Sequence, residues 1–506
     1  MSAKRKQRGQ QAAKQPAPPQ KTWSVASSVR ALLVGFFVCS ALVRIAPLDP
    51  IVAFLIGGAA AGLAASGVLE ALAAAFAGQV ATVLVMLVPL GQQSTQLPEG
   101  LAALSFVGVM LGAVAGWGVA RIVDRQWVAR ALLAVLVLIF LVQAMALAKP
   151  LAQNISVEMP AESYSFDPVF FVKVFYLQEA GKAFYPAYGE AFAGDARFDQ
   201  ATPDLAGWRS PTTSTLWSLL FSHGGQIVYA FLFLAACAMV AAYHLARRVS
   251  DEASALVAPA LLAPYYVAAV RLFWFTEYEF WATFVLLGAA VLVSLKRYWP
   301  ALGLAFLAGA MREWLISGAV ASSVHLLLHR KWKKAIPWVA VTFAIGALYI
   351  ANMYFVRGYL ESVGIVPSLG ATGRLGGGGV GFILYTLKFC SDLLAHPLVV
   401  PYAAFALALA GAVQRILAKD YYLAGLLLLP LCAFMIFGSN QPPLGDTGWN
   451  DYYNASFWPF ALVLAPAAWH FPGWKRTAAV EGSAKRAAAD RGSAPRSSKA
   501  AAKGRA

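Results

Sequence analysis

The feature that most constrains this chain is the recurrence, almost from end to end, of apolar stretches long enough to cross a membrane. A bilayer core about 30 Å thick needs roughly 20 apolar residues, because an α-helix rises about 1.5 Å per residue. Of the 506 residues, 59% are hydrophobic and 13% are charged, about half the charged share of a typical soluble domain. The sequence therefore predicts an all-α polytopic membrane protein.

Fourteen apolar segments are predicted to be transmembrane helices. They lie at 30–47, 51–69, 73–90, 101–120, 128–148, 224–246, 254–273, 277–295, 300–312, 314–329, 336–355, 397–415, 421–438 and 456–472. The second and third are rich in Ala and Gly and are joined by very few residues, so a re-entrant pair is the alternative there. The two segments on either side of Arg312 and Glu313 are short for a full crossing and predict a hairpin that reaches only the outer headgroup zone.

The net charge of +16 is concentrated at the two ends of the chain. Residues 1–29 and 473–506 are basic, lack an apolar period and are predicted to be disordered cytoplasmic tails. Basic residues at the ends of a membrane protein mostly set its topology and attract anionic headgroups. The charge therefore indicates a membrane-lipid partner and no nucleic acid.

The loops that alternate between the predicted spans differ in charge. Those expected in the cytoplasm are basic, whereas 149–215 contains eight acidic and five basic residues. The positive-inside bias predicts a multi-pass protein of the inner (plasma) membrane with both termini inside. The large outer loops are then 149–215, 356–394 and 439–455.

Polar side chains gather on the predicted outer face. The stretch 176–185 predicts an amphipathic helix lying in the interface plane, and further polar residues flank the sixth, seventh and last spans. Ionisable groups at membrane depth are costly unless they are paired or used. We therefore expect an outer-leaflet cavity in which a carboxylate acts as general base and arginines hold a phosphate.

Four elements, taken in order, resemble the GT-C superfamily of membrane glycosyltransferases. An acidic residue, Asp167, lies early in the first large outer loop, and a turn over 181–185 follows it. Trp208-Arg209-Ser210-Pro211 opens the next span. The short hairpin around Arg312-Glu313 and the basic cluster 329–334 complete the pattern.

The resemblance covers about 128–472 and defines a catalytic core over 121–472. The chain departs from the family pattern by four additional spans, which form an N-terminal module over 30–120. The role of this module is not indicated by its sequence.

The resemblance implies transfer of a sugar from a polyprenyl-phosphate donor to a cell-envelope glycan, lipid or protein acceptor, with inversion, on the extracytoplasmic face. Asp167 would be the general base. The expected phosphate-binding residues are Arg312, Arg209, Arg271 and Lys182. The expected sugar- or acceptor-binding residues are Glu277, Glu279, Glu313, Trp208, Trp449, Asn450, Asp451 and Tyr452.

No cofactor is indicated by the residues themselves. Some members of the family hold a divalent cation, and here Asp167, Glu277, Glu279 and Asp451 would be its oxygen ligands. His325 and His329, at i and i+4 beside a basic cluster, fit headgroup-facing charge better than a metal site.

Structural alternatives accompany these assignments. Asp167 precedes Pro168 and so also fits a helix N-cap, and Glu277 and Glu279 also fit a solvated turn. Arg312 and Glu313 are neighbours in sequence and would point apart on a helix. At the level of the whole chain, a polysaccharide polymerase or ligase and a flippase or transporter of a lipid-linked glycan remain alternatives.

Overall fold

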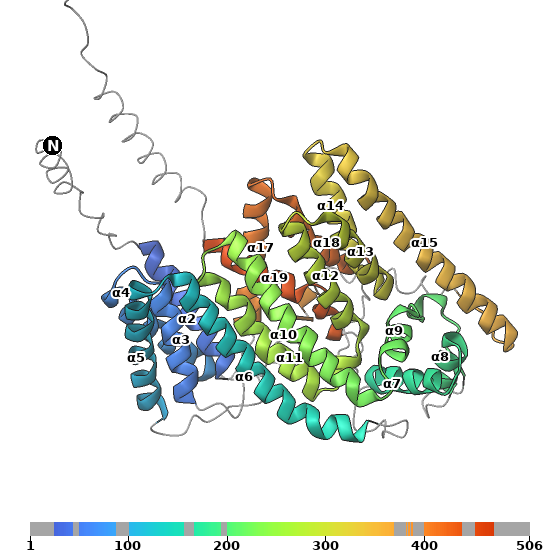
Figure 1. The fold of residues 1–506 in the computed structure, drawn as a ribbon, viewed down its shortest axis with the longest axis horizontal. Coiled ribbons are helices and arrows are strands. Elements are labelled where there is room, and N and C mark those ends of the chain that lie inside the picture. Colours follow the sequence, from blue (N-terminus) through green and yellow to red (C-terminus); the bar gives the residue numbers. More distant parts are fainter. Residues whose placement is uncertain are drawn as a thin grey trace, which may run out of the picture.

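The computed structural model describes residues 25–43, 50–87, 101–155, 166–193, 200–368, 381, 383–384, 386–387, 399–437 and 451–469. Its named elements are all α- or 3-10 helices, so the predicted all-α fold is confirmed for these ranges. Figure 1 shows an elongated bundle in which helices α2–α5 lie at one end and helices α7–α9 at the other.

The N-terminal module consists of four packed helices. They are α2 (Val25–Leu42), α3 (Pro50–Ala64), α4 (Val68–Leu87) and α5 (Leu101–Ile122). Helix α2 begins at Val25, five residues before the predicted boundary at 30. Within these five residues, the Ser28 hydroxyl donates a hydrogen bond to Glu70 of α4. The predicted N-terminal tail is shorter by that amount.

Helices α3 and α5 pack backbone to backbone. A Cβ placed on Gly58 would lie 2.1 Å from the carbonyl oxygen of Val109, and one on Gly112 would lie 2.1 Å from that of Leu55. Small residues allow this close approach of membrane helices, where van der Waals contact replaces the hydrophobic effect as the source of association. The Ala and Gly content of this region therefore has a packing explanation.

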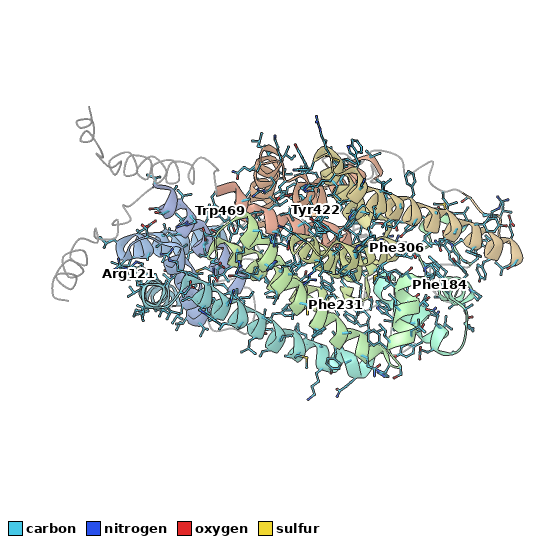
Figure 2. The ribbon with its side chains drawn as sticks, turned by 45° about the horizontal axis from the view of Figure 1, so that its top comes forward. Arg121, Phe184, Phe231, Phe306, Tyr422 and Trp469 are labelled. Carbon is cyan, nitrogen blue, oxygen red and sulfur yellow. The ribbon has the colours of Figure 1, made fainter. Side chains whose placement is uncertain are left out.

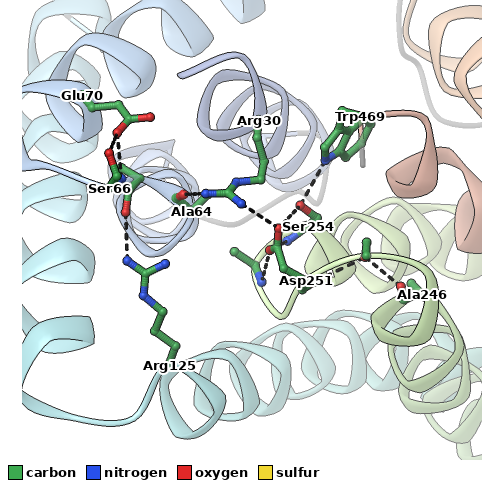
Figure 3. Close-up of polar contacts among 12 residues, drawn as sticks. Arg30, Ala64, Ser66, Glu70, Arg125, Ala246, Asp251, Ser254 and Trp469 are labelled. Atoms are coloured by element: carbon green, nitrogen blue, oxygen red, sulfur yellow. Dashed lines mark hydrogen bonds and ion pairs between the residues drawn. The ribbon is translucent and has the colours of Figure 1, made fainter. Parts of the chain in front are cut away.

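A polar seam joins this module to the rest of the chain (Figure 3). Arg30 on α2 pairs with Asp251 at 3.1 Å and donates to the carbonyl oxygen of Ala64 at 2.6 Å. Asp251 also accepts from Ser254, whose hydroxyl oxygen accepts from the Trp469 indole at 3.0 Å. The seam thus connects α2, the α10–α11 turn and the end of the last helix.

The central layer is built from apolar helices of 7 to 30 residues. They are α6 (Arg125–Asn154), α10 (Gly224–Val249), α11 (Val257–Arg271), α12 (Tyr278–Ser294), α17 (Val399–Leu417), α18 (Tyr421–Phe437) and α19 (Trp458–Leu464). Phe231 on α10 is fully buried in the middle of the bundle, between Arg121 at the module end and Phe184 at the opposite end (Figure 2).

The polar region 149–215 folds partly into three helices: α7 (Phe166–Glu179), α8 (Phe184–Ala193) and α9 (Thr212–Leu220). The predicted continuous helix over 176–185 is wrong, because Gly181 takes a left-handed conformation with φ +90°. The N–H of Lys182 donates to the carbonyl oxygen of Leu177 at 3.1 Å and closes the end of α7. Gly is the usual residue at such a helix end.

The short hairpin predicted around residue 312 is present. Helix α13 (Tyr298–Met311) stops at Arg312, a 3-10 turn η6 (Glu313–Ile316) follows, and α14 (Ser317–Leu328) runs back. The next helix, α15 (Trp332–Ser362), has 31 residues and reaches α8, where the Tyr185 hydroxyl donates to Asn352 at 2.9 Å.

Each of the fourteen predicted apolar segments overlaps a helix of the structure. By length and composition, six helices within the described ranges can cross a membrane: Val25–Leu42, Arg125–Asn154, Gly224–Val249, Ser254–Arg271, Trp332–Ser362 and Val400–Leu417. The other apolar helices are shorter. The protein is therefore a helical membrane protein.

Candidate active site

Arg312 lies at the centre of a buried charge cluster at the tip of the hairpin. Its side chain is 1% exposed, and its Nε donates to Glu279 of α12. Its Nη1 donates to Glu313 Oε1 at 2.7 Å, and its guanidinium lies 5.6 Å from the ring centroid of Tyr453. One cation thus bridges two carboxylates and faces an aromatic ring.

The prediction that Arg312 and Glu313 do not pair is wrong. It assumed a continuous helix, in which consecutive side chains diverge. Arg312 instead has an extended backbone, with φ −149° and ψ 121°, and Glu313 begins a 3-10 turn. The break in the hairpin therefore brings the two neighbouring side chains together.

Glu277 and Glu279 lie where α11 turns into α12, and both are fully buried. The solvated-turn alternative is therefore wrong. Before this turn, Phe273 is in the left-handed region at φ 66°. That conformation costs a bulky residue about 1–2 kcal/mol, and such outliers cluster at functional sites. The turn that carries the two acids is thus held in a strained backbone.

Arg209 approaches the same cluster from the segment before α9. It is half-buried and lies within electrostatic range of Arg312, Glu313 and the Tyr349 hydroxyl. The structure therefore brings together four of the predicted site residues, Arg209, Arg312, Glu279 and Glu313, from three separate parts of the chain.

A largely apolar cavity of ≈ 370 Å³ opens beside these charges. It lies between η6, α14, α15 and α18. Its polar edge carries Glu313 and Tyr349, and its other walls include Trp314, Ile345 and Leu429. An apolar cavity with a few convergent polar groups is the usual form of a binding site.

Among the described residues around Arg312, acidic side chains outnumber basic ones. Glu277, Glu279 and Glu313 contribute three carboxylates, and Arg209 and Arg312 contribute two guanidinium groups. Burying charges is costly unless they are paired, so this group of buried ionisable side chains is a candidate functional site.

Asp167 lies in the first turn of α7, one residue after the helix begins at Phe166. It is therefore inside the helix and not ahead of it as an N-cap; its side chain lies outside the described residues. One turn further, Phe171 stacks on Tyr278, with ring centroids 4.3 Å apart and planes at 30°. Helix α7 thus docks on the turn that carries Glu277 and Glu279.

Three predicted residues lie away from the cluster. Trp208 is 3% exposed, stacks on Tyr188 at 4.7 Å and donates its indole N–H to Thr202. It is part of an aromatic core and has no face open to a sugar. Lys182 is exposed and pairs with Glu190, and Arg271 is exposed at the end of α11.

The remaining predicted residues lie in or next to the segment before the last helix. Trp449 and Asn450 fall outside the described residues. Asp451 and Tyr452 begin the 3-10 helix η8 (Asp451–Ser456), and their side chains are also outside the description. Within the described ranges, no group of three or more His, Cys, Asp or Glu residues is arranged to hold a metal ion.

Two tyrosines of the site were not predicted. Tyr349 stands in the middle of an apolar helix, and Tyr453 follows directly after Asp451 and Tyr452. The sequence does show that Tyr349 places a polar hydroxyl within a predicted transmembrane span, and this could have marked it as a site residue. No sequence signal paired Tyr453 with Arg312, because their contact depends on the tertiary fold.

No protein-family model matches the chain, and comparisons with curated proteins and with solved structures also give no match. The geometry of the site is therefore the basis for assigning a function.

Proposed function

We propose that the protein is a GT-C-type glycosyltransferase that moves a sugar from a polyprenyl-phosphate donor to a cell-envelope acceptor. In this proposal about fourteen helices cross the plasma membrane, both termini are cytoplasmic, and the reaction takes place on the extracytoplasmic face. The observation that carries the proposal is the buried Arg312 cluster at the edge of an apolar cavity.

The cavity suits a ligand with an apolar chain and an anionic head. Its apolar walls between α14, α15 and α18 would hold part of an isoprenoid chain, and its polar edge lies next to two arginines. The Nη2 of Arg312 is buried and makes no hydrogen bond within the part of the chain that the structure describes. Guanidinium groups bind phosphate oxygens through parallel N–H donors, so this nitrogen and Arg209 would receive the lipid phosphate.

The carboxylates would supply the base. An ordinary carboxyl has a pKa of ~3.9, far too low to deprotonate a sugar hydroxyl in advance. The proton must therefore pass to the carboxylate as the acceptor oxygen attacks the anomeric carbon. In the same step the bond from that carbon to the phosphate oxygen breaks, and the lipid phosphate leaves with the electron pair. Attack opposite the leaving group inverts the anomeric centre.

Positioning carries most of this catalysis, because the base is weak and the leaving phosphate needs cations nearby. Asp167 is the proposed base, since it lies one turn before Phe171, which packs on Tyr278 next to Glu277. Glu277 is the second candidate, because it lies fully buried on that same turn.

The composition of the cluster favours a transferase over the two alternatives. A polymerase or ligase would be expected to rely on Arg and His, whereas the described residues of this cluster include three Glu and no His. A transporter would be expected to place its polar residues near the middle of the membrane. This cluster lies at the tip of a hairpin of short helices.

The test is transfer without a nucleotide. Purified protein in detergent is incubated with radiolabelled polyprenyl-phosphate sugars and total lipid extract, and label is followed into a new product. We expect transfer by the wild type, at least ~10²-fold less by Asp167→Asn, and unchanged transfer by Glu361→Gln, an exposed acid of α15 paired with Arg357. Folded protein that translocates a labelled lipid across vesicles but transfers no sugar would overturn the proposal.

A further inference from the structure

A second cavity, of ≈ 380 Å³, lies at the other end of α14. The first cavity is beside the start of this helix at Ser317, whereas the second is lined by Ser322 and His325 near its end. Its walls come from the end of α10 and from the turns α12–α13, α14–α15 and α17–α18, all on the face predicted to be cytoplasmic. It is therefore separate from the proposed active site.

Each of the three turns has a basic residue at the position where a helix usually ends in glycine. After α12, α14 and α17 the chain passes through Lys296, Arg330 and Lys419, with φ of 61°, 56° and 61°. Each turn is closed by a backbone hydrogen bond of 2.8 Å that spans five residues, such as the one from Arg297 N–H to the Leu292 carbonyl oxygen. Glycine is the usual residue at this position, so three basic side chains stand where a left-handed backbone disfavours them.

Helix dipoles account for part of this choice, since cations stabilise helix C-termini. They do not account for the gathering of charge around one cavity. Lys296, Lys331 and Arg248 line it, against one acid, Asp420, which is already paired with Arg415 at 3.6 Å. The Nδ1 of His325 in the same wall is buried and has no hydrogen bond to any described residue. The cavity therefore attracts an anion.

Two exposed tryptophans indicate the depth of the cavity. Trp299 is 75% exposed beside Tyr298, and Trp332 is 62% exposed beside Lys331. Tryptophan is enriched at the headgroup level of membranes, where its ring has an apolar body and a polar N–H. The rest of the wall includes Val293, Leu326 and Leu423. The anion therefore comes with an apolar part, at the level of lipid headgroups.

We propose that this cavity binds the phosphate headgroup of an anionic phospholipid of the cytoplasmic leaflet. Lys296, Lys331 and Arg248 contact the phosphate, and the apolar wall receives the start of an acyl chain. The proposal does not depend on the activity proposed for the outer face.

The experiment measures lipid retained by purified protein. Wild type in detergent is titrated with phosphatidylglycerol, with phosphatidylcholine or with inorganic phosphate, and bound lipid is counted by native mass spectrometry while thermal unfolding is recorded. We expect retention of phosphatidylglycerol and little of phosphatidylcholine. The double variant Lys296→Asn/Lys331→Gln should lose about ten-fold or more in affinity, since it removes two charge-assisted contacts.

The controls separate a built site from general charge attraction. Asparagine tolerates the left-handed backbone, so Lys296→Asn removes charge without adding strain. Lys333→Gln removes one positive charge from an exposed residue outside the cavity lining and should keep wild-type affinity. If the double variant does not fold, Arg248→Gln, which lies within a helix and not in a turn, gives the same test. Retention of phosphatidylglycerol by the double variant, or by Arg248→Gln, that equals retention by the wild type overturns the proposal. Stabilisation of the protein by inorganic phosphate alone to the same extent also overturns it.

Discussion

The N-terminal module and the hairpin region differ in what their helices bury against one another. The module brings backbones into contact through glycines on α3 and α5 and has few buried polar groups, such as Glu70 and Gln79. The hairpin region buries a cluster of arginines and glutamates at the break between its two short helices. Close packing of small residues is enough to associate membrane helices, so the buried charges of the hairpin are the feature on which the proposed function rests.

The comparison predicts that the two regions respond differently to substitution. Changes in the module should alter stability and leave turnover of the folded fraction unchanged. Changes in the charge cluster should alter both, and the following predictions run from the largest expected effect to the smallest.

Arg312→Ala should have the largest effect. It leaves Glu279 buried without its cation, and removing one partner of a buried ion pair costs about 3–5 kcal/mol. Thermal unfolding in detergent measures the loss, and the exposed Arg357→Ala should change it little. A double variant, Arg312→Met with Glu279→Gln, should recover part of the stability. If Arg312→Ala unfolds like the wild type, the cluster is not a structural element.

Asp167→Asn should have the second largest effect, and it should lower turnover without lowering stability. The substitution is nearly isosteric and removes the proposed general base, so turnover should fall ~10²-fold or more while the unfolding temperature stays close to that of the wild type. Glu179→Gln, at the exposed end of the same helix, is the matched control. Wild-type turnover in Asp167→Asn would transfer the role of base to Glu277.

Gly112→Ala should destabilise the module alone. The added Cβ would lie 2.1 Å from a backbone carbonyl oxygen of α3, so the helices must separate, at a cost of about 1–3 kcal/mol. Gly118→Ala on the same helix meets nothing within 4 Å and should be neutral. Equal unfolding of the two variants would contradict the close approach, and loss of turnover in folded Gly112→Ala would show that the module takes part in the reaction.

Arg30→Gln should have the smallest effect. It removes a half-buried ion pair with Asp251 and weakens the seam, with an expected loss of about 1 kcal/mol in stability. Lys149→Gln, exposed on α6, serves as the control. If Arg30→Gln lowers stability as much as Arg312→Ala does, the module is an integral part of the fold.

Hydropathy located the apolar helices and the short hairpin, because the length and apolar content of a segment decide where such a helix forms, but it did not find the helices α7–α9 of the polar region. It also placed Arg312, Glu279 and Arg209 on one face. Hydropathy does not report local breaks in the backbone. The extended backbone at Arg312 allows its ion pair with Glu313, which a continuous helix would not allow. The left-handed Gly181 divides one predicted helix into two. Trp208 was predicted to contact a sugar, but it is buried against Tyr188. The sequence of a polar loop does not show whether an aromatic residue in it is buried by other aromatic residues.

Helix α15 contributes to both cavities. Trp338, near its start, lines the basic cavity, Ile345 and Tyr349 line the cavity at the charge cluster, and Tyr359 packs against Trp208 near its end. At about 1.5 Å per residue, its 31 residues form a rod of roughly 46 Å. A tilt of about 5° around the Trp332 end would move the Ser362 end by about 4 Å over that length. Because one rigid helix lines both cavities, a tilt of α15 would change the width of both at once.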